Sequence, residues 1–327
     1  MITMKDIARE VGTSQSTVSR VLNGNMSVNP EIRNKVMECV KKYNYKPNML
    51  AQSLAANKSL LIGVIIPDIS NPFFSDLVLA IESEAMKYGY SIILCNTDGN
   101  LAKEKYYINI LSGYKVDGII MVPRNIKDKF FLNLRKSSIP VVIATLEVDK
   151  FDYVTVSHYE AGQKVAKHLI DKGFDKFAFV GNVDDEKEKG FITGLKEAGY
   201  NLETDYRFID ISTKNMISEK LRPLTEDKEW KSNCGIFAMN DVIALIVLDA
   251  LKEYKVKVPD EIGLIGFDNT FIGKEVTPSI SSVAQPIEEI GKQSIEMLLE
   301  KMMNKNEKSE RGIILDTKII SRETTNR

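Results

Sequence analysis

From Leu60 onward, short apolar runs rich in branched residues alternate with stretches of helical periodicity. The runs form two series: LLIGVII (60–66), SIILC (91–95), VDGIIMV (116–122) and IPVVIA (139–144), then FAFVG (177–181), GIFAM (235–239) and EIGLIGF (261–267). Runs of this kind separated by helices predict parallel strands whose two faces are both covered by helices. Two series predict two α/β lobes, each built on a doubly wound parallel sheet.

Residues 1–46 follow another pattern, which predicts an all-α head of three short helices. Thr3 and Asp6 have the spacing of a capping box at the first helix. Gly12-Thr13-Ser14 then breaks that helix, and Ser14 is a suitable N-cap for a second one. Asn29-Pro30 starts a third, with proline at its favoured first position. A helix, a tight turn and a second helix form the helix-turn-helix plan.

The predicted second helix has one apolar and one polar face. Val18, Val21 and Leu22 share the apolar face, which is expected to be buried. The other face and the exposed N-terminus carry Gln15, Ser16, Ser19, Arg20 and Asn23. A solvated surface helix has the same pattern. The polar types also suit DNA, because Arg donates two hydrogen bonds to a guanine edge and Gln or Ser reaches bases or phosphates.

Charge is unevenly distributed along the chain. Residues 1–60 hold nine Lys/Arg and four Asp/Glu, a net charge of +5, whereas the remainder carries −6. A basic head on an acidic body indicates that the head meets a polyanion.

Three segments of the head, KDIAREVGTSQSTVSRVLNG (5–24), VNPEIRNKV (28–36) and YKPNMLAQSLA (45–55), resemble the LacI/GalR family of bacterial transcription regulators. The resemblance implies a sequence-specific DNA-binding regulator, most simply a dimeric repressor. It makes Gln15, Ser16 and Arg20 the base-reading positions, of which Gln15 and Ser16 vary within the family and select the operator. The positions that match backbone-contacting residues are Thr3, Ser14, Thr17, Ser19, Asn23 and Tyr45.

Residues 47–59 begin with PNMLAQSLAAN, which is too short to form a stable free helix. Composition leaves open a plain linker. The family resemblance implies a hinge helix that folds on the operator, with Leu54 wedged into a base step and Asn48, Ala51 and Gln52 beside it. Paired hinges imply a homodimer and a pseudo-palindromic operator.

Ligands of open α/β sheets bind beyond the carboxyl ends of the strands. Asn71 and Asn240 follow two predicted strands, and each is also an ordinary helix cap. PDISNPFF (67–74), MNDVIAL (239–245), VPDEIGLIGFDNT (258–270) and TPSISSVAQP (277–286) resemble the periplasmic-binding-protein type I core with which this family senses small effectors. The resemblance implies a cleft between the lobes lined by Asn71, Phe73, Phe74, Asn240, Asp268 and Gln285.

The chain departs from the pattern of sugar-responsive members at several cleft positions. Thr145 and Leu146 stand where an Asp-Arg pair is frequent, Lys187 where an Arg is frequent, and Ser157-His158 where Asp-Asn is usual. Lys cannot reproduce the bidentate fork of Arg. With Thr145 and Lys187 among the candidate effector-binding residues, we hypothesise an unusual effector: a modified or less polar sugar, or none.

The expected organisation is a DNA-binding domain at 1–46, a hinge at 47–59 and a two-lobed effector-binding and dimerisation domain at 60–327. The first lobe is expected at about 60–158 plus 288–318, and the second at about 159–287 plus the C-terminal tail.

Three other kinds of protein compete with a metabolite-gated regulator. An enzyme is disfavoured, since the chain has two histidines and shows no phosphate-binding loop, zinc-protease motif or nucleophile elbow; no catalytic residue, metal or cofactor is expected. A solute-binding protein is disfavoured because the charged start, MITMKDIARE, does not resemble a signal peptide. A regulator gated by a partner, such as a phosphorylated sugar-transport carrier protein of the catabolite-control branch, stays open.

The expected location is the bacterial cytoplasm, at the nucleoid when bound to DNA, without contact with the membrane. Cys39, Cys95 and Cys234 form no CxxC pair and are expected to be buried thiols.

Overall fold

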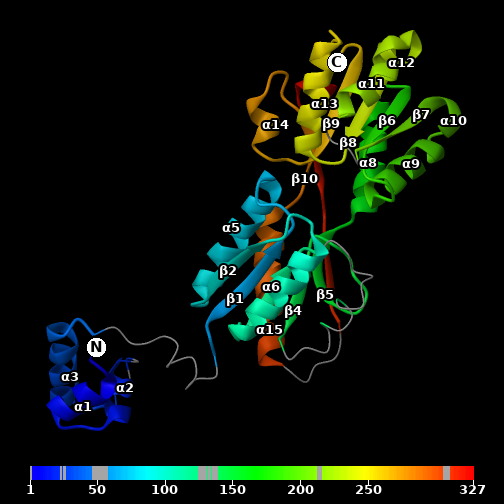
Figure 1. Ribbon diagram of the computed structural model, residues 1–327. Helices are drawn as coiled ribbons and strands as arrows, with labels where there is room; N and C mark the ends of the chain where they lie inside the picture. The colour runs from blue at the N-terminus through cyan, green and yellow to red at the C-terminus, as the bar shows by residue number, and fades with distance from the viewer. Residues whose placement is uncertain are drawn as a thin grey trace. The chain divides into compact units, whose positions relative to one another are not determined.

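The chain divides into two compact units, Met1–Leu60 and Leu61–Arg327 (Figure 1). The computed structural model describes residues 2–22, 24, 27–45, 58–123, 131, 134, 139–211, 216–304 and 310–327.

The N-terminal unit contains three helices, α1 (Met4–Val11), α2 (Gln15–Leu22) and α3 (Pro30–Lys42). Ile7, Val18 and Val36, one from each helix, are fully buried in a single apolar cluster. Helices this short are marginal in isolation, so this shared core stabilises them. The predicted three-helix head is confirmed.

The first lobe of the larger unit is a six-stranded sheet of order β11-β5-β4-β3-β1-β2, in which every neighbouring pair is parallel. Its elements are β1 (Leu61–Ile66), α5 (Pro72–Lys87), β2 (Ser91–Asn96), α6 (Leu101–Gly113), β3 (Gly118–Met121), β4 (Val141–Ala144), β5 (Asp152–Val156), α15 (Ile287–Met303) and β11 (Gly312–Leu315).

The second lobe is a six-stranded sheet of order β12-β10-β9-β8-β6-β7, parallel except for the antiparallel pairing of β10 with β12. Its elements are α8 (His158–Asp171), β6 (Lys176–Gly181), α9 (Glu186–Glu197), α10 (Leu202–Asp205), β7 (Tyr206–Asp210), α11 (Ile217–Glu226), α12 (Lys228–Asn233), β8 (Cys234–Ala238), α13 (Asp241–Glu253), β9 (Ile262–Asp268), α14 (Ile272–Glu275), β10 (Ser281–Ala284), β12 (Lys318–Ile320) and the 3-10 turn η2 (Glu323–Thr325).

Alternating burial along the central strands explains the layers. Val64 of β1 lies in one apolar cluster with Leu77 of α5, whereas Ile65 lies in another with Leu111 of α6. Successive side chains of a strand point to opposite faces, so each face needs its own helices. Both predicted α/β lobes are confirmed.

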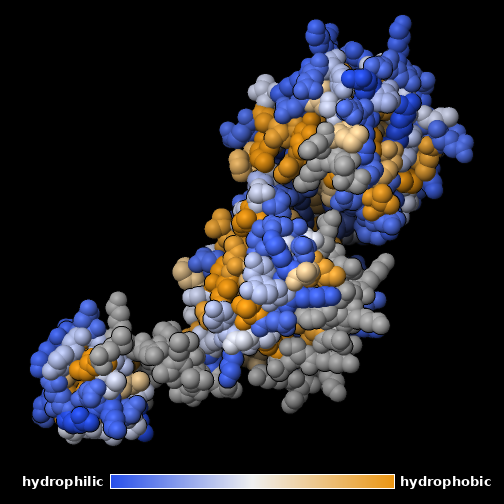
Figure 2. All heavy atoms as spheres, in the orientation of Figure 1, coloured by the Kyte–Doolittle hydropathy of each residue, from blue (hydrophilic) through white to orange (hydrophobic). Residues whose placement is uncertain are grey.

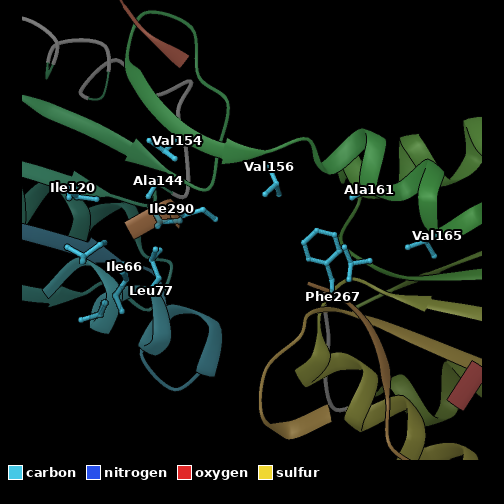
Figure 3. Packing of buried hydrophobic residues seen from close by; sticks show 14 of the residues in the cluster. Ile66, Leu77, Ile120, Ala144, Val154, Val156, Ala161, Val165, Phe267 and Ile290 are labelled. Atoms are coloured by element: carbon cyan, nitrogen blue, oxygen red, sulfur yellow. The ribbon is translucent and has the colours of Figure 1, made fainter. Parts of the chain in front are cut away.

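Three short segments carry the chain between the lobes: Ser157 joins β5 to α8, Gln285–Pro286 join β10 to α15, and Asp316–Thr317 join β11 to β12. Figure 3 shows Val156 at the end of β5, between the side chains of the first sheet and Phe267 of the second. One apolar cluster includes residues of both sheets, so the two lobes share part of their core.

All three cysteines are buried and free, as the sequence predicts. Among the described helices, none has the length and apolar character needed to cross a membrane.

Candidate functional site

The first helix of the head is fixed at both ends. Thr3 Oγ1 accepts a hydrogen bond from the Asp6 amide over 3.3 Å, and Asp6 Oδ2 accepts one from the Thr3 amide over 3.0 Å. This reciprocal pair is the predicted capping box. Gly12 ends the helix with φ of 71°, a left-handed conformation that glycine adopts without strain. The turn that follows leads directly into α2.

The second helix turns its apolar side inward. Val18 and Val21 are buried in the core of the head, whereas Gln15, Ser16 and Arg20 are exposed. We call these three exposed residues the recognition face. Ser19 and Thr17 are partly buried at its margin. A short helix that exposes an amide, a hydroxyl and a guanidinium has the dimensions and donors that fit a major groove.

The Ser14 hydroxyl organises the start of α2. Its oxygen accepts a hydrogen bond from the Thr17 amide over 3.1 Å and lies 2.8 Å from Ser16 Oγ and 2.9 Å from Thr17 Oγ1. Ser14 is therefore the N-cap that the sequence predicts.

Two other basic residues of the head, Arg9 and Lys42, are held in ion pairs. Arg9 lies 3.7 Å from Asp6, and Lys42 Nζ lies 2.8 Å from Glu10. The hydrogen bond that Lys42 donates to Glu10 raises the pKa of Lys42 above its ordinary value. Arg20 is exposed, and no ion pair involves it among the described residues. Its guanidinium can therefore bind another molecule without breaking an ion pair to the described part of the head.

In the larger unit, two asparagines begin helices after strands. Asn71 Oδ1 accepts from the Phe73 amide over 3.1 Å at the start of α5, and Asn240 Oδ1 accepts from the Ile243 amide over 2.9 Å at the start of α13. Both residues are partly buried. Because each uses its oxygen as a cap, the amide nitrogen is the group each can offer to a ligand.

Asp268 and Gln285 meet at the carboxyl edge of the second sheet. Gln285 Nε2 donates to Asp268 Oδ1 over 2.7 Å, and both residues are buried. Asp268 has φ of 98° and Asn269 has φ of 54°, so two successive non-glycine residues adopt positive φ. Such backbone conformations are sparsely populated and concentrate at functional sites. Burial, and then the neighbouring Asp241 carboxylate, raise the pKa of Asp268 to about 7.

Asp241 holds the loop after β9 against α13. Its carboxylate accepts from the Ser282 hydroxyl over 2.6 Å, from the Thr270 amide over 2.6 Å and from the Thr270 hydroxyl over 3.0 Å. Burial nevertheless raises the pKa of Asp241 to about 6. Its oxygens are occupied within the protein, which makes Asp241 a positioning residue for Asp268.

Lys187 lies beside an aromatic ring and a carboxylate. Its Nζ is 3.5 Å from both Asp185 oxygens and 4.9 Å from the centre of the Phe267 ring. The His158 ring packs against the same phenylalanine, with ring centres 5.6 Å apart. Burial, together with the charge of Lys187, lowers the pKa of His158 to about 3, so this histidine is neutral at physiological pH.

The remaining candidates lie at the carboxyl edge of the first sheet. Phe73 is only 4% exposed and meets the partly buried Phe74 edge to face, with centres 5.2 Å apart. Thr145 follows β4, is buried, and has φ of 67°. In the described part of the chain, no hydrogen bond or ion pair joins these residues to Asp268, Gln285 or Lys187. The candidates thus form two groups, one on each lobe.

Residues 3–48 match the model of bacterial regulatory proteins of the lacI family, and residues 166–325 match a periplasmic binding protein-like domain. The chain is 36% identical to catabolite control protein A of Priestia megaterium over 332 residues, which cover 99% of each protein. The chain belongs to the LacI family of bacterial transcription regulators. As such it is a DNA-binding transcription regulator with a helix-turn-helix head.

Two solved LacI-family structures extend the comparison. A regulator from Alkaliphilus metalliredigens QYMF complexed with D-xylulofuranose is 32% identical, with a TM-score of 0.70 over 81% of this chain and 98% of that one. The lac repressor dimer bound to operator and the anti-inducer ONPF is 24% identical, with a TM-score of 0.86 over 99% of each chain. The latter supports the fold alone.

Some of the predicted LacI-type contacts fall outside the described residues: Asn23, Asn48, Ala51 and Leu54. Tyr45, predicted to contact the DNA backbone, lies against the core of the head, and its amide donates to Val40 over 2.9 Å. Asp185, which lies beside the candidate residue Lys187, is a residue that sequence reasoning missed. Its signal was its place as the N-cap of α9, two residues before Lys187.

Proposed function

We propose that this regulator is a repressor that binds a pseudo-palindromic operator as a homodimer. The observation that carries the proposal is the recognition face, in which the exposed Gln15, Ser16 and Arg20 project from a helix anchored by Val18 and Val21. In the head of a LacI-family protein, these side chains are proposed to read base edges. Thr3, Ser14, Thr17, Ser19 and Tyr45 are proposed to contact the backbone of the DNA. DNA of this kind lies in the bacterial cytoplasm, where the protein is proposed to act at the nucleoid.

A second copy of the chain is proposed to cover α5 and the neighbouring edge strand. Leu79 and Met86 of α5 are each 64% exposed, and Leu94 of β2 and Tyr88 are exposed as well. Figure 2 shows hydrophobic residues gathered over this part of the first lobe. Large exposed apolar side chains in one patch mark an interaction surface. A symmetric dimer matches the two half-sites of a pseudo-palindrome.

A small carbohydrate-like effector between the lobes is proposed to set operator affinity. Asn71, Phe73, Phe74 and Thr145 lie at the strand ends of one lobe, and Asn240, Asp268, Gln285 and Lys187 at those of the other. The relative bound to D-xylulofuranose supports a sugar-like ligand. Such a ligand shifts operator affinity only by its differential affinity for two arrangements of the lobes. The hinge residues Asn48, Ala51 and Leu54 are proposed to transmit the difference.

The second candidate is gating by a phosphorylated carrier protein. The 36% identity to catabolite control protein A favours it, as does the replacement of charged cleft residues by Thr145 and Leu146. In that case the partner, and not a metabolite, selects the DNA-binding arrangement of the lobes.

One titration separates the two candidates. The protein is bound to a fluorescent duplex selected from random sequences, and sugars, sugar derivatives or the phosphorylated carrier protein are added in turn. A metabolite that lowers affinity supports the proposed repressor. Tighter binding with the carrier protein alone, without any response to metabolites, contradicts the metabolite gate and supports the second candidate.

A further inference from the structure

Asp268 is a buried carboxylate without a dedicated cation. It is 7% exposed at the end of β9. Among the described residues, no Lys, Arg or His nitrogen forms an ion pair with it, and it accepts a hydrogen bond from the neutral side-chain amide of Gln285. A buried charge is costly unless it is paired, so this carboxylate either takes up a proton or needs a positive partner.

The cations nearest to Asp268 are already engaged. Lys187 Nζ lies 3.5 Å from each of the two oxygens of Asp185. Arg322 donates to the Ile280 carbonyl and to Asn269 Oδ1. Its charge also stabilises Asp241, and His158, behind the Phe267 ring, is neutral at physiological pH. Three carboxylates, those of Asp185, Asp241 and Asp268, therefore face the two positive charges of Lys187 and Arg322.

Gln285 adds a second and independent signal at the same point. It is 8% exposed, and its Oε1 is the one buried side-chain oxygen or nitrogen that has no hydrogen-bond partner in the described part of the chain. Its Nε2 donates to Asp268, so the unpartnered Oε1 belongs to the same amide group that contacts the carboxylate. A buried acceptor without a donor is costly, so a molecule that binds here is favoured if it brings a hydrogen-bond donor.

We propose that the effector of this regulator carries a protonated amine on a polyhydroxylated frame, as an amino sugar does, and that Asp268 and Gln285 Oε1 hold the ammonium group. This inference rests on the proposed function, in that it assumes an effector at this end of the second sheet. An ammonium group has three donors and no acceptor, which matches a carboxylate oxygen beside an amide oxygen. A neutral hydroxyl supplies one donor and leaves the charge of Asp268 uncompensated.

Proton linkage gives the proposal a signature that a neutral sugar lacks. In the ligand-free protein Asp268 is about half protonated at pH 7, because its pKa is raised to about 7. An ammonium ligand favours the ionised carboxylate, so binding releases a proton. Affinity for the amine is then lower at lower pH, where less of the carboxylate is ionised. Between about pH 7.0 and pH 5.5 the ionised fraction falls about 15-fold, and affinity is expected to fall with it.

Calorimetry with matched sugars tests the proposal on the full chain. Glucosamine, galactosamine and mannosamine are each compared with the parent hexose and with the N-acetyl derivative, which keeps the nitrogen but loses the charge. We expect at least one amine to bind about 10-fold or more tightly than its parent and its N-acetyl form. We also expect its binding enthalpy at about pH 7 to vary with the ionisation enthalpy of the buffer, which reports proton release.

Asp268→Asn removes the charge of this side chain and keeps its shape. Asp249→Asn, which makes the same change on the exposed face of α13, is the control. The preference for the amine is expected to disappear in D268N and to persist in D249N. The wild-type proton release keeps the test valid if D268N does not fold. Equal or tighter binding of the neutral forms, no binding of any amine, or binding without proton release overturns the inference. If a neutral sugar releases operator DNA, the proposed function stands and only the amine-bearing effector is wrong. If no metabolite changes the affinity for operator DNA, both the amine-bearing effector and the metabolite-gated repressor are contradicted.

Discussion

Gln285, in a segment that crosses between the lobes, donates a hydrogen bond from its side-chain amide to Asp268 of the second lobe over 2.7 Å. Asp268 ends β9 of the second sheet, whereas Gln285 lies in the segment that crosses from β10 to α15 of the first lobe. A ligand at this pair therefore acts on the crossing segment itself. Binding there can therefore favour one relative arrangement of the two lobes over another.

Arg20→Ala is expected to weaken specific operator binding by about 1–3 kcal/mol and to relax selectivity at one base position. The cause is the loss of a bidentate donor from the recognition face. Fluorescence anisotropy on the selected operator and on single-base variants measures both effects. Arg222→Ala, which removes an exposed arginine of α11, is the control and should change neither. An equal loss on all sequences would show that Arg20 contacts phosphates only.

Thr3→Ala removes both side-chain hydrogen bonds that Thr3 makes with Asp6. Opening of the first turn of α1 should become easier, so its amides are expected to exchange with deuterium about five-fold faster. Hydrogen exchange of the full chain, read by mass spectrometry, gives the rate. Thr13→Ala, in the turn after α1, is the comparison variant, and equal acceleration in both variants would argue against the cap.

Lys187→Met is expected to raise the pKa of His158, because the positive charge beside the ring contributes to its low value. Burial is the larger cause, so the pKa should stay below the ordinary value of 6.5. The chain has two histidines, and the proton resonances of their rings can be assigned with His168→Gln. Lys189→Met, which removes an exposed lysine paired with Glu186, should leave His158 unchanged. An unchanged pKa in K187M would place Lys187 away from His158.

Asp268→Asn is expected to stabilise the protein more as the pH rises. The pKa of Asp268 in the folded state, about 7, lies above the ordinary 3.8. The folded state therefore binds more protons than the unfolded state between about pH 4 and 7, and the contribution of Asp268 to stability is lost as the pH rises through that range. The neutral amide of D268N does not titrate, so the variant does not lose stability in this way. The difference in melting temperature, D268N minus wild type, should grow across this window, and a constant difference would contradict the raised pKa.

Leu79→Glu with Met86→Glu is expected to weaken dimerisation by about 10-fold or more, because both charges would be buried at the proposed interface. Sedimentation analysis gives the association constant. Met303→Glu, at the exposed end of α15, is the control and should leave it unchanged. If the double variant remains as dimeric as the wild type, the interface lies elsewhere.

Prediction of the fold from sequence succeeded where strands are buried on both faces. β1 is a continuous branched run because helices cover both of its faces. β7 and β11 lie at sheet edges, where fewer of their side chains are buried; β7 reads YRFID and lacks such a run, and β11 offers only the short GIIL. β11 also needs β5 as its partner, from a segment far away in the chain. Pairing of this kind is non-local, and no local pattern indicates it.

The sequence predicted which residues of the candidate site lie at the ends of strands, but not how their side chains pair. Asn71, Asn240 and Asp268 follow strands, and the carboxyl edge of a parallel sheet collects such residues. The hydrogen bond from Gln285 to Asp268 was not predictable, because it depends on the positive φ of Asp268 and on where the crossing segment returns, which tertiary structure decides. The contact of Lys187 with Asp185 is local, and the N-cap position of Asp185 was the signal for it.

The central claim, that α2 reads a symmetric DNA sequence, is tested most directly by selection of duplexes from a random library with the full-length protein. The account predicts one enriched pseudo-palindrome, bound by two copies of the chain, whose outer bases lose selectivity in R20A. Enrichment of no common sequence, or of a site without two-fold symmetry that R20A binds equally well, would contradict it.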